Sequence, residues 1–181
     1  MRTPASNRKK ALIIIDVQPG FIKPKNKAII KKIIWLLNNK HYDAYIESVF
    51  NAEKNSLWEK QQNWILPKGP DTHTDFEIGK ALKKYSSLLI TKQTKSVFKG
   101  STNLQTYLSK KNIKEVHIVG LDTNDCILAS AYEAFDLGFL TYVIEECCQS
   151  SSSENLHKNA LALLRHQNMT NHSVVTRKHK K

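Results

Sequence analysis

Short apolar runs alternate with amphipathic helical patterns along this chain, and this alternation restricts its fold more than any other feature. The apolar runs have the length and β-branched content of buried strands, and the segments between them repeat apolar residues with helical spacing. The predicted strands are 11–15, 43–50, 86–91, 116–119, 139–146 and 173–176, and the predicted helices are 28–39, 76–85, 104–111, 124–137 and 154–167. This pattern predicts a three-layer α/β fold, in which helices cover both faces of a six-stranded parallel sheet through right-handed crossovers.

The chain has 181 residues, which is enough for one domain with a sizeable core. We expect this domain over residues 10–176, between a flexible basic N-terminus at 1–9 and a basic tail at 177–181. The formal net charge is +12, but residues 1–10 and 177–181 each carry four basic groups and no acid. Because the two ends hold most of this excess, we do not expect nucleic acid to be the main partner.

The sequence also limits the compartment in which the protein is expected. No apolar run approaches the roughly 20 residues that span a bilayer, and the run at 11–15 is too short for a secretory signal. Three cysteines, two of them adjacent (Cys147 and Cys148), predict no disulfide framework and have no zinc-site spacing. We therefore expect a cytoplasmic protein that does not associate with membranes.

Polar residues follow three of the predicted strands. Asp16 ends the first strand, Lys92 follows the third and Cys126 follows the fourth. In doubly wound sheets, ligands bind beyond the carboxyl ends of the strands, where the winding reverses. A reversal between the first and fourth strands would bring all three residues to one crevice. Taken singly, Asp16 could cap a loop, and Lys95 or Lys99 could supply the positive charge instead of Lys92.

Cys126 lies in a turn at 120–126, just where the next predicted helix begins. A helix N-terminus offers free N–H groups and the positive end of the helix dipole, so we expect the pKa of this thiol to be lowered. The alternative is that Cys126 is a small buried hydrophobic residue. Cys147 and Cys148 follow the fifth strand, and we expect them to be buried packing groups.

Three blocks of the sequence, at 13–21, 90–108 and 120–139, resemble signature segments of the isochorismatase-like cysteine hydrolases. This superfamily includes nicotinamidases, N-carbamoylsarcosine amidases and ureidoacrylate or biuret hydrolases. The blocks contain Asp-x-Gln, Lys-x-x-x-Ser-x-Phe and Thr-x-x-Cys in the order that the family has them, and the second motif favours Lys92 over the neighbouring lysines. The resemblance implies a Rossmann-like sheet with strand order 3-2-1-4-5-6.

The resemblance also implies a catalytic triad of Asp16, Lys92 and Cys126. A thiol nucleophile needs a base, which Asp16 could provide, and the charge of Lys92 would favour both the thiolate and the ionised Asp16. An oxyanion hole is implied at the backbone N–H groups of Asp122 and Cys126, with a cis peptide between Leu121 and Asp122.

Four further residues are expected to bind the substrate: Gln18, Phe21, Trp58 and Thr123. Aromatic residues in the irregular segment 51–75 could instead form a lid or an oligomer contact. The side chains of Asp122 and Asn124 in the turn suggest no substrate by themselves.

The chain departs from the nicotinamidase pattern in one respect. Nicotinamidases carry Asp-x-His and a further histidine after the second strand, and these bind a metal, whereas residues 45–58 here contain no histidine. We therefore expect neither a metal nor another cofactor. The presence of Cys126 also argues against a true isochorismatase, which cleaves a vinyl ether without a cysteine nucleophile.

Together these features predict a metal-independent cysteine hydrolase that cleaves a C–N bond of a small amide or ureido-type molecule through a thioester. The protein is expected to form a homo-oligomer, as members of the family do. The alternative is a catalytically idle member that acts as a binding or scaffold module.

Overall fold

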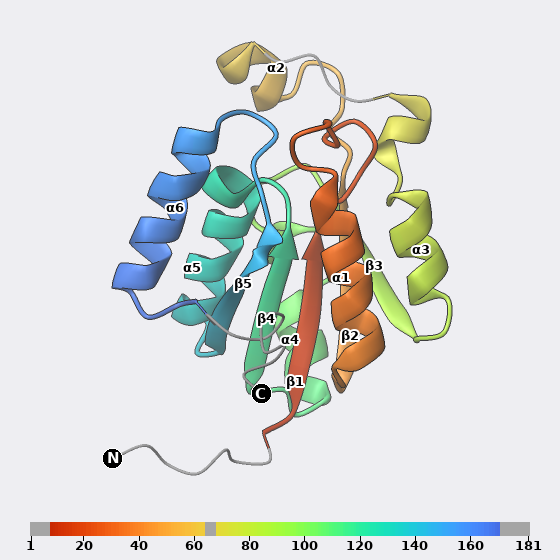
Figure 1. Ribbon diagram of the computed structural model, residues 1–181, viewed down its shortest axis with the longest axis vertical. Coiled ribbons are helices and arrows are strands. Elements are labelled where there is room, and N and C mark those ends of the chain that lie inside the picture. The colour runs from red at the N-terminus through yellow and green to blue at the C-terminus, as the bar shows by residue number, and fades with distance from the viewer. Residues whose placement is uncertain (1–7, 64–67, 171–181) are drawn as a thin grey trace, which may run out of the picture.

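The computed structural model describes residues 8–63 and 68–170 of the chain. Its five strands form one parallel sheet with the order β3-β2-β1-β4-β5. The strands are β1 (Lys10–Ile15), β2 (Ala44–Phe50), β3 (Ser87–Lys92), β4 (Glu115–Gly120) and β5 (Leu140–Cys148). The order reverses between β1 and β4, which is the reversal that the family resemblance implies (Figure 1).

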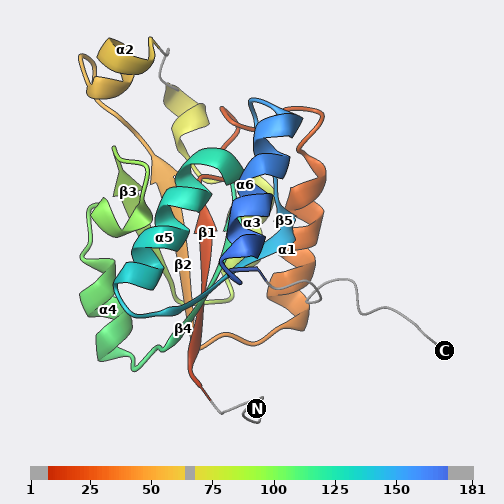
Figure 2. The same ribbon diagram turned by 90° about the vertical axis from the view of Figure 1, so that its left-hand side faces the viewer.

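Helices cover both faces of this sheet, as Figures 1 and 2 show. One face packs against α1 (Ala28–Asn39) and α3 (Phe76–Leu82), and the other against α4 (Leu104–Lys110), α5 (Leu128–Asp136) and α6 (Glu154–His166). Strand β1 serves both cores, because Leu12 and Ile14 point to the first face, whereas Ile13 and Ile15 point to the second. The three-layer α/β architecture is therefore confirmed.

The predicted sixth strand, 173–176, lies outside the described residues, so the described sheet has five strands instead of the six expected. Beside β5, the backbone N–H of Val143 donates to Met169 O at 2.8 Å, and an isolated parallel bridge joins Val143 to Thr170. Residues 169–170 thus run along the outer side of β5, the edge that faces away from β4.

Two element boundaries differ from the prediction at the carboxyl edge of the sheet. The helix expected from residue 124 begins with a π-helical turn, Thr123–Ile127, before α5 starts. Strand β5 extends through Cys148, so Cys147 and Cys148 end this strand instead of following it. Both cysteines are buried, which confirms that they are packing groups.

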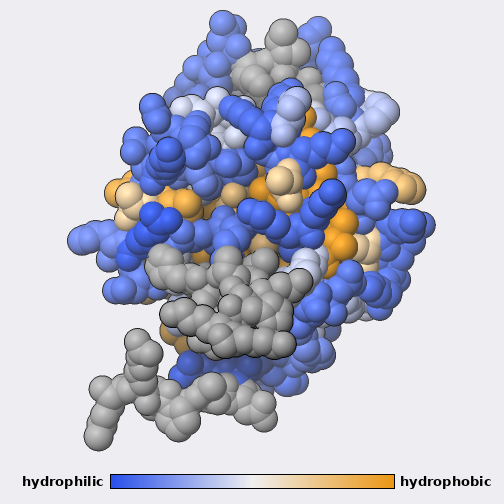
Figure 3. Space-filling view, viewed as in Figure 1, coloured by the Kyte–Doolittle hydropathy of each residue, from blue (hydrophilic) through white to orange (hydrophobic). Residues whose placement is uncertain are grey.

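The irregular segment 51–75 contains a short helix, α2 (Leu57–Gln62), and a 3-10 turn, Gly69–Thr72. Helix α2 stands beyond the carboxyl end of the sheet (Figures 1 and 2), and it has no buried residue. On the face drawn in Figure 3, hydrophilic side chains dominate and apolar ones form smaller groups. In the described parts of the chain, no helix combines the length and apolar character needed to cross a membrane.

Candidate active site

Asp16 is the first residue after β1, and its backbone has a φ of +51°. Few residues other than glycine adopt this left-handed conformation, although aspartate tolerates it better than most, and it is often found at functional sites. Ser48 of the neighbouring strand holds the residue from two sides: its carbonyl accepts from Asp16 N–H at 3.1 Å, and its hydroxyl donates to Asp16 Oδ1 at 2.8 Å. The carboxylate is thereby fixed at the carboxyl edge of the sheet.

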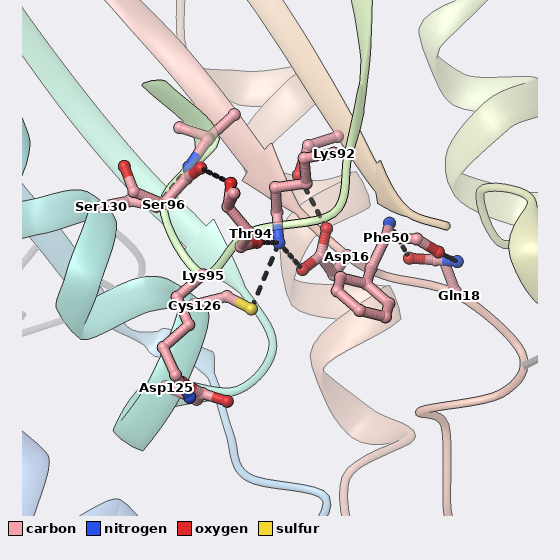
Figure 4. Close-up of polar contacts among 12 residues, drawn as sticks. Asp16, Gln18, Phe50, Lys92, Thr94, Lys95, Ser96, Asp125, Cys126 and Ser130 are labelled. Atoms are coloured by element: carbon pink, nitrogen blue, oxygen red, sulfur yellow. Dashed lines mark hydrogen bonds and ion pairs between the residues drawn. The ribbon is translucent and has the colours of Figure 1, made fainter. Parts of the chain in front are cut away.

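Lys92 is the last residue of β3, and its side chain is fully buried. Its Nζ lies 2.6 Å from Asp16 Oδ2, 3.2 Å from Cys126 Sγ and 2.9 Å from Thr94 O (Figure 4). An ammonium group has three N–H donors, and these three contacts occupy all of them. Lys92 therefore links the carboxylate to the sulfur, and the three residues predicted from strand ends converge at one point.

Lys95 and Lys99, the two alternatives to Lys92, pair with acids other than Asp16. Lys95 forms an ion pair with Asp125, and Lys99 forms one with Glu133 at 3.0 Å. The position of Lys92 agrees with the motif that selected it.

Gly120 allows the turn that carries Cys126 to approach β1. Its φ is +121°, and a Cβ at this position would lie only 2.1 Å from Ile15 O. A side chain there would push the end of β4 away from β1. After Gly120 the chain passes through a cis peptide between Leu121 and Asp122, as the resemblance implies, and enters the π-helical turn that contains Cys126.

The prediction of a lowered pKa for Cys126 is wrong. Burial raises the pKa of this thiol, the negative charges of Asp16 and Asp125 raise it further, and the charge of Lys92 only partly opposes them. Burial alone would lower the pKa of Lys92, but the charge of Asp16, together with Cys126 and the hydrogen bonds to both residues, raises this pKa and keeps the lysine protonated. The resting site therefore holds a neutral thiol beside an Asp–Lys ion pair, because the helix N-terminus does not outweigh burial and a nearby carboxylate.

A cavity of about 400 Å³ opens over Cys126. Its lining includes Asp16 and Cys126 from the converging group, and Phe21 and Trp58 among the predicted substrate-binding residues. The remaining lining residues are Gly20, Lys23, Phe50, Gln62, Leu121, Asp122, Asn124, Asp125, Ser151 and Ser152. A cavity of this size suits a small molecule.

The family model for the isochorismatase domain matches residues 10–176 of this chain. The chain belongs to the isochorismatase family. Among curated proteins, it is 31% identical over 147 residues to the uncharacterized isochorismatase family protein YrdC of Bacillus subtilis, covering 76% of this chain and 72% of that protein. It is 28% identical over 173 residues to a nicotinamidase of Acinetobacter baylyi, covering 77% and 81% of the two chains.

Solved structures agree with the isochorismatase fold. A nicotinamidase from Bacillus subtilis superposes with a TM-score of 0.75 at 20% identity, covering 91% of this chain and 99% of that one. A pyrazinamidase of Pyrococcus horikoshii, solved in complex with zinc, has a TM-score of 0.73 at 20% identity, covering 90% and 97%. At this level of identity, the likeness establishes the fold.

The residues after β2 of this isochorismatase-family chain do not fit a zinc site. The positions there are Asn51, Ala52 and Glu53, and Glu53 accepts a hydrogen bond from Gln93 at 3.3 Å. Zinc sites usually draw on several histidine, cysteine or carboxylate ligands. Across residues 8–63 and 68–170, no three such side chains are placed to share an ion.

Aromatic residues form one wall of the cavity in this isochorismatase-family protein. The rings of Phe50 and Trp58 meet edge to face, with their centroids 4.8 Å apart, and the centroids of the Phe21 and Phe50 rings are 6.3 Å apart. The indole N–H of Trp58 donates to Gln93 O at 2.8 Å, and Lys95 Nζ lies 4.6 Å from the centre of the Trp58 ring. These contacts hold α2 over the cavity.

Gln18 and Thr123 are not part of the cavity lining. The buried Gln18 amide accepts from Phe50 N–H at 2.7 Å, and it donates to Phe50 O and Asp71 O, both at 3.1 Å. Thr123 is buried as well, and its hydroxyl bonds to His157 Nδ1 at 2.9 Å. Gln18 therefore supports the wall at Phe50, and Thr123 supports the turn that holds Cys126.

Phe50 and Ser151 are among the residues of the site that sequence reasoning missed. Phe50 ends β2, so its place at a strand end was a signal of the same kind as that of Asp16. Ser151 lies in the loop before α6, whose N-cap is Ser153. Its contact with Asp122 joins segments 29 residues apart, and no local sequence pattern predicts this contact.

Proposed function

We propose that this protein is a metal-independent cysteine hydrolase that cleaves a C–N bond of a small amide or ureido-type compound through a thioester. The observation that carries the proposal is the position of Lys92 Nζ between Asp16 Oδ2 and Cys126 Sγ, at 2.6 and 3.2 Å. The similarity to a nicotinamidase at 28% identity supports an amide as the substrate class.

In the first half of the reaction, Cys126 attacks the substrate carbonyl carbon while its thiol proton moves to the Asp16 carboxylate. The raised pKa of Cys126 fits this order of events, because the proton stays on sulfur until a substrate is present. The S–C bond forms, and the carbonyl electrons move to oxygen, where the backbone N–H groups of Asp122 and Cys126 would stabilise the negative charge. The protonated Asp16 then gives its proton to the departing nitrogen as the C–N bond breaks.

In the second half, Asp16 takes a proton from a water molecule, which attacks the thioester carbonyl. The C–S bond breaks, the acid leaves, and the proton returns from Asp16 to the thiolate. Lys92 remains charged throughout and balances the negative charge that alternates between Asp16 and Cys126. No step requires a cofactor.

The alternative is a catalytically idle family member that binds a ligand or serves as a scaffold. A cavity that reaches both Asp16 and Cys126 favours the enzyme, because an idle protein has no need to expose a base and a thiol to the same small chamber.

The test is ammonia release from a panel of primary amides and ureides that includes nicotinamide. Wild-type protein should hydrolyse at least one member, with no change on adding a chelator. Cys126→Ala should lower that rate by about 10³-fold or more, whereas Cys147→Ala should retain it. Turnover that survives in Cys126→Ala would disprove the nucleophile. Acid quenching during turnover should trap an acyl group on Cys126.

Two further expectations accompany the proposal. A homo-oligomer is supported by exposed apolar side chains on the adjacent helices α5 and α6, namely Phe135, Leu156 and Leu163. Sedimentation at micromolar concentration should show a dimer or a larger assembly. A cytoplasmic location is supported by the three free cysteines.

A further inference from the structure

Asp122, whose side chain ends in a carboxylate, is one of the residues that line the cavity over Cys126. Ser151 holds it with two hydrogen bonds: the backbone N–H donates to Oδ1 at 2.8 Å, and the hydroxyl donates to Oδ2 at 2.6 Å. Each carboxylate oxygen can accept two hydrogen bonds, so each retains one free acceptor position. Asp122 is thus fixed in orientation without being saturated.

No cation of the described chain pairs with Asp122, although the other two acids of the lining each have a lysine partner. Asp16 pairs with Lys92, and Asp125 pairs with Lys95. Burial raises the pKa of Asp122 and the charges of Asp125 and Asp16 add to this, while the Ser151 hydrogen bonds act against it. A positive or N–H-rich group in the cavity would offset this uncompensated charge.

A second acceptor of the cavity is also without a partner. Asn124 lines it, and the buried Oδ1 of this residue has no hydrogen-bond partner within the described part of the chain. Two side-chain donors of the lining are already engaged, the Trp58 indole N–H with Gln93 O and the Ser151 hydroxyl with Asp122. Lys23 and Gln62 also line the cavity, but both are exposed to solvent.

We infer that Asp122 is a specificity-determining residue, which selects amides carrying a cationic or N–H-rich group and disfavours amides carrying a carboxylate. The inference rests on the proposed function, since it concerns the ligand of the same cavity. The Asp122 side chain would accept hydrogen bonds from the substrate's nitrogen, while its backbone N–H serves the oxyanion. A carboxylate on the substrate that lies near Asp122 would instead be repelled by its charge.

Three amides of similar length separate charge from size: 3-aminopropanamide is cationic, butanamide is neutral and succinamate is anionic. We expect kcat/KM to fall in that order for the wild-type protein. In Asp122→Asn, a substitution that keeps an acceptor for Ser151, the cationic-to-neutral ratio of kcat/KM should fall about tenfold or more. The anionic-to-neutral ratio should rise. Asp136→Asn removes the same charge at the far end of α5, and both ratios should stay at their wild-type values.

A purely structural role for Asp122 predicts a different result, namely that Asp122→Asn slows all three amides by the same factor. Ser151→Ala tests this further: it weakens the hold on Asp122 but leaves the charge, so the preference for the cationic amide should persist. Equal losses for all three amides in Asp122→Asn, or a wild-type preference for succinamate, would overturn the inference.

Binding separates this inference from the proposed hydrolysis. If the wild-type protein hydrolyses no amide, the proposed function fails. The inference about Asp122 can still be tested by titrating each of the three amides into Cys126→Ala and measuring binding by ligand-observed NMR. Tighter binding of 3-aminopropanamide that depends on Asp122 supports it. Equal binding of the three compounds, or no binding of the cationic one, overturns it.

Discussion

Lys92 Nζ lies 2.6 Å from Asp16 Oδ2, and the two side chains are only 0% and 2% exposed. Because water cannot solvate two charges this deeply buried, each charge is stabilised by the other. Removal of one charge leaves the other desolvated and unpaired, which is far more costly than the loss of a surface ion pair.

Lys92→Met should therefore lower the free energy of unfolding by about 3–5 kcal/mol. Lys95→Met is the matched control, because the Lys95 side chain is 49% exposed and its pair with Asp125 lies at the surface. This control should cost less than about 1 kcal/mol. Urea unfolding of the two variants measures the difference. Equal losses would mean that Lys92 is not the buried partner of Asp16.

Asp16→Asn should increase the rate at which iodoacetamide alkylates Cys126 at about pH 8, while abolishing hydrolysis. The charge of Asp16 raises the pKa of the Cys126 thiol, so its removal exposes more thiolate to the reagent. Lys92→Met should have the opposite effect on labelling, since Lys92 lowers that pKa. Mass spectrometry after a brief exposure gives the rates.

Cys147 and Cys148 provide the internal control for this experiment. Burial and the charge of Glu146 raise the pKa of Cys147 to about 12, and burial raises that of Cys148 as well. Neither lines the cavity, so both should label more slowly than Cys126 in wild-type protein. Comparable labelling of all three cysteines in the folded protein would contradict the assignment of Cys126 to an accessible site.

Gln18→Met should reduce stability by about 2–5 kcal/mol, because it leaves two backbone groups of Phe50 and the Asp71 carbonyl without their partner. Gln62→Met is the contrasting change: Gln62 is exposed and lines the cavity, so its loss should alter KM and leave the urea midpoint unchanged. A Gln18 variant of normal stability with altered substrate preference would restore the original hypothesis that Gln18 contacts the substrate.

His157→Gln should make stability less sensitive to acid. Burial lowers the pKa of His157 in the folded protein, whereas in the unfolded chain it should be near 6.5. As the pH falls below about 6.5, the unfolded chain binds a proton that the folded protein does not, and stability declines. Without His157 this decline should be shallower between about pH 7 and about pH 5, measured as urea midpoints. If the urea midpoint of His157→Gln changes with pH as steeply as that of the wild-type protein, the lowered pKa of His157 is contradicted. Asn159→Gln, on the same helix, is the control and should keep the wild-type pH dependence.

The converging residues could be predicted from sequence because strand ends are locally encoded. An apolar run that stops at Asp16, at Lys92 or before Cys126 identifies its own carboxyl end, and parallel strands bring such ends to one edge. The side-chain environment of Gln18 was not predictable in this way. Its partners, Phe50 and Asp71, lie 32 and 53 residues along the chain, and only the folded structure places them beside it.

The state of the Cys126 thiol illustrates the same limit. The start of a helix is visible in the sequence and suggests an acidic thiol, but the decisive effects are burial and the proximity of Asp16, which arise from packing between β1 and β4. Similarly, Asp122 appeared uninformative in sequence because its meaning depends on Ser151 and on the absence of a paired cation in the described structure.

Helix α2 contributes Trp58 to the cavity wall, yet it buries none of its own residues. Segments with so few buried contacts open at much lower free energy than a central sheet. Helix α2, which forms part of the cavity wall, should thus open at lower free energy than the strands that hold Asp16 and Lys92. On warming, the part of the cavity wall formed by α2 should open while Cys126 and Asp16 still lie together, so that substrate binding weakens before the catalytic residues separate.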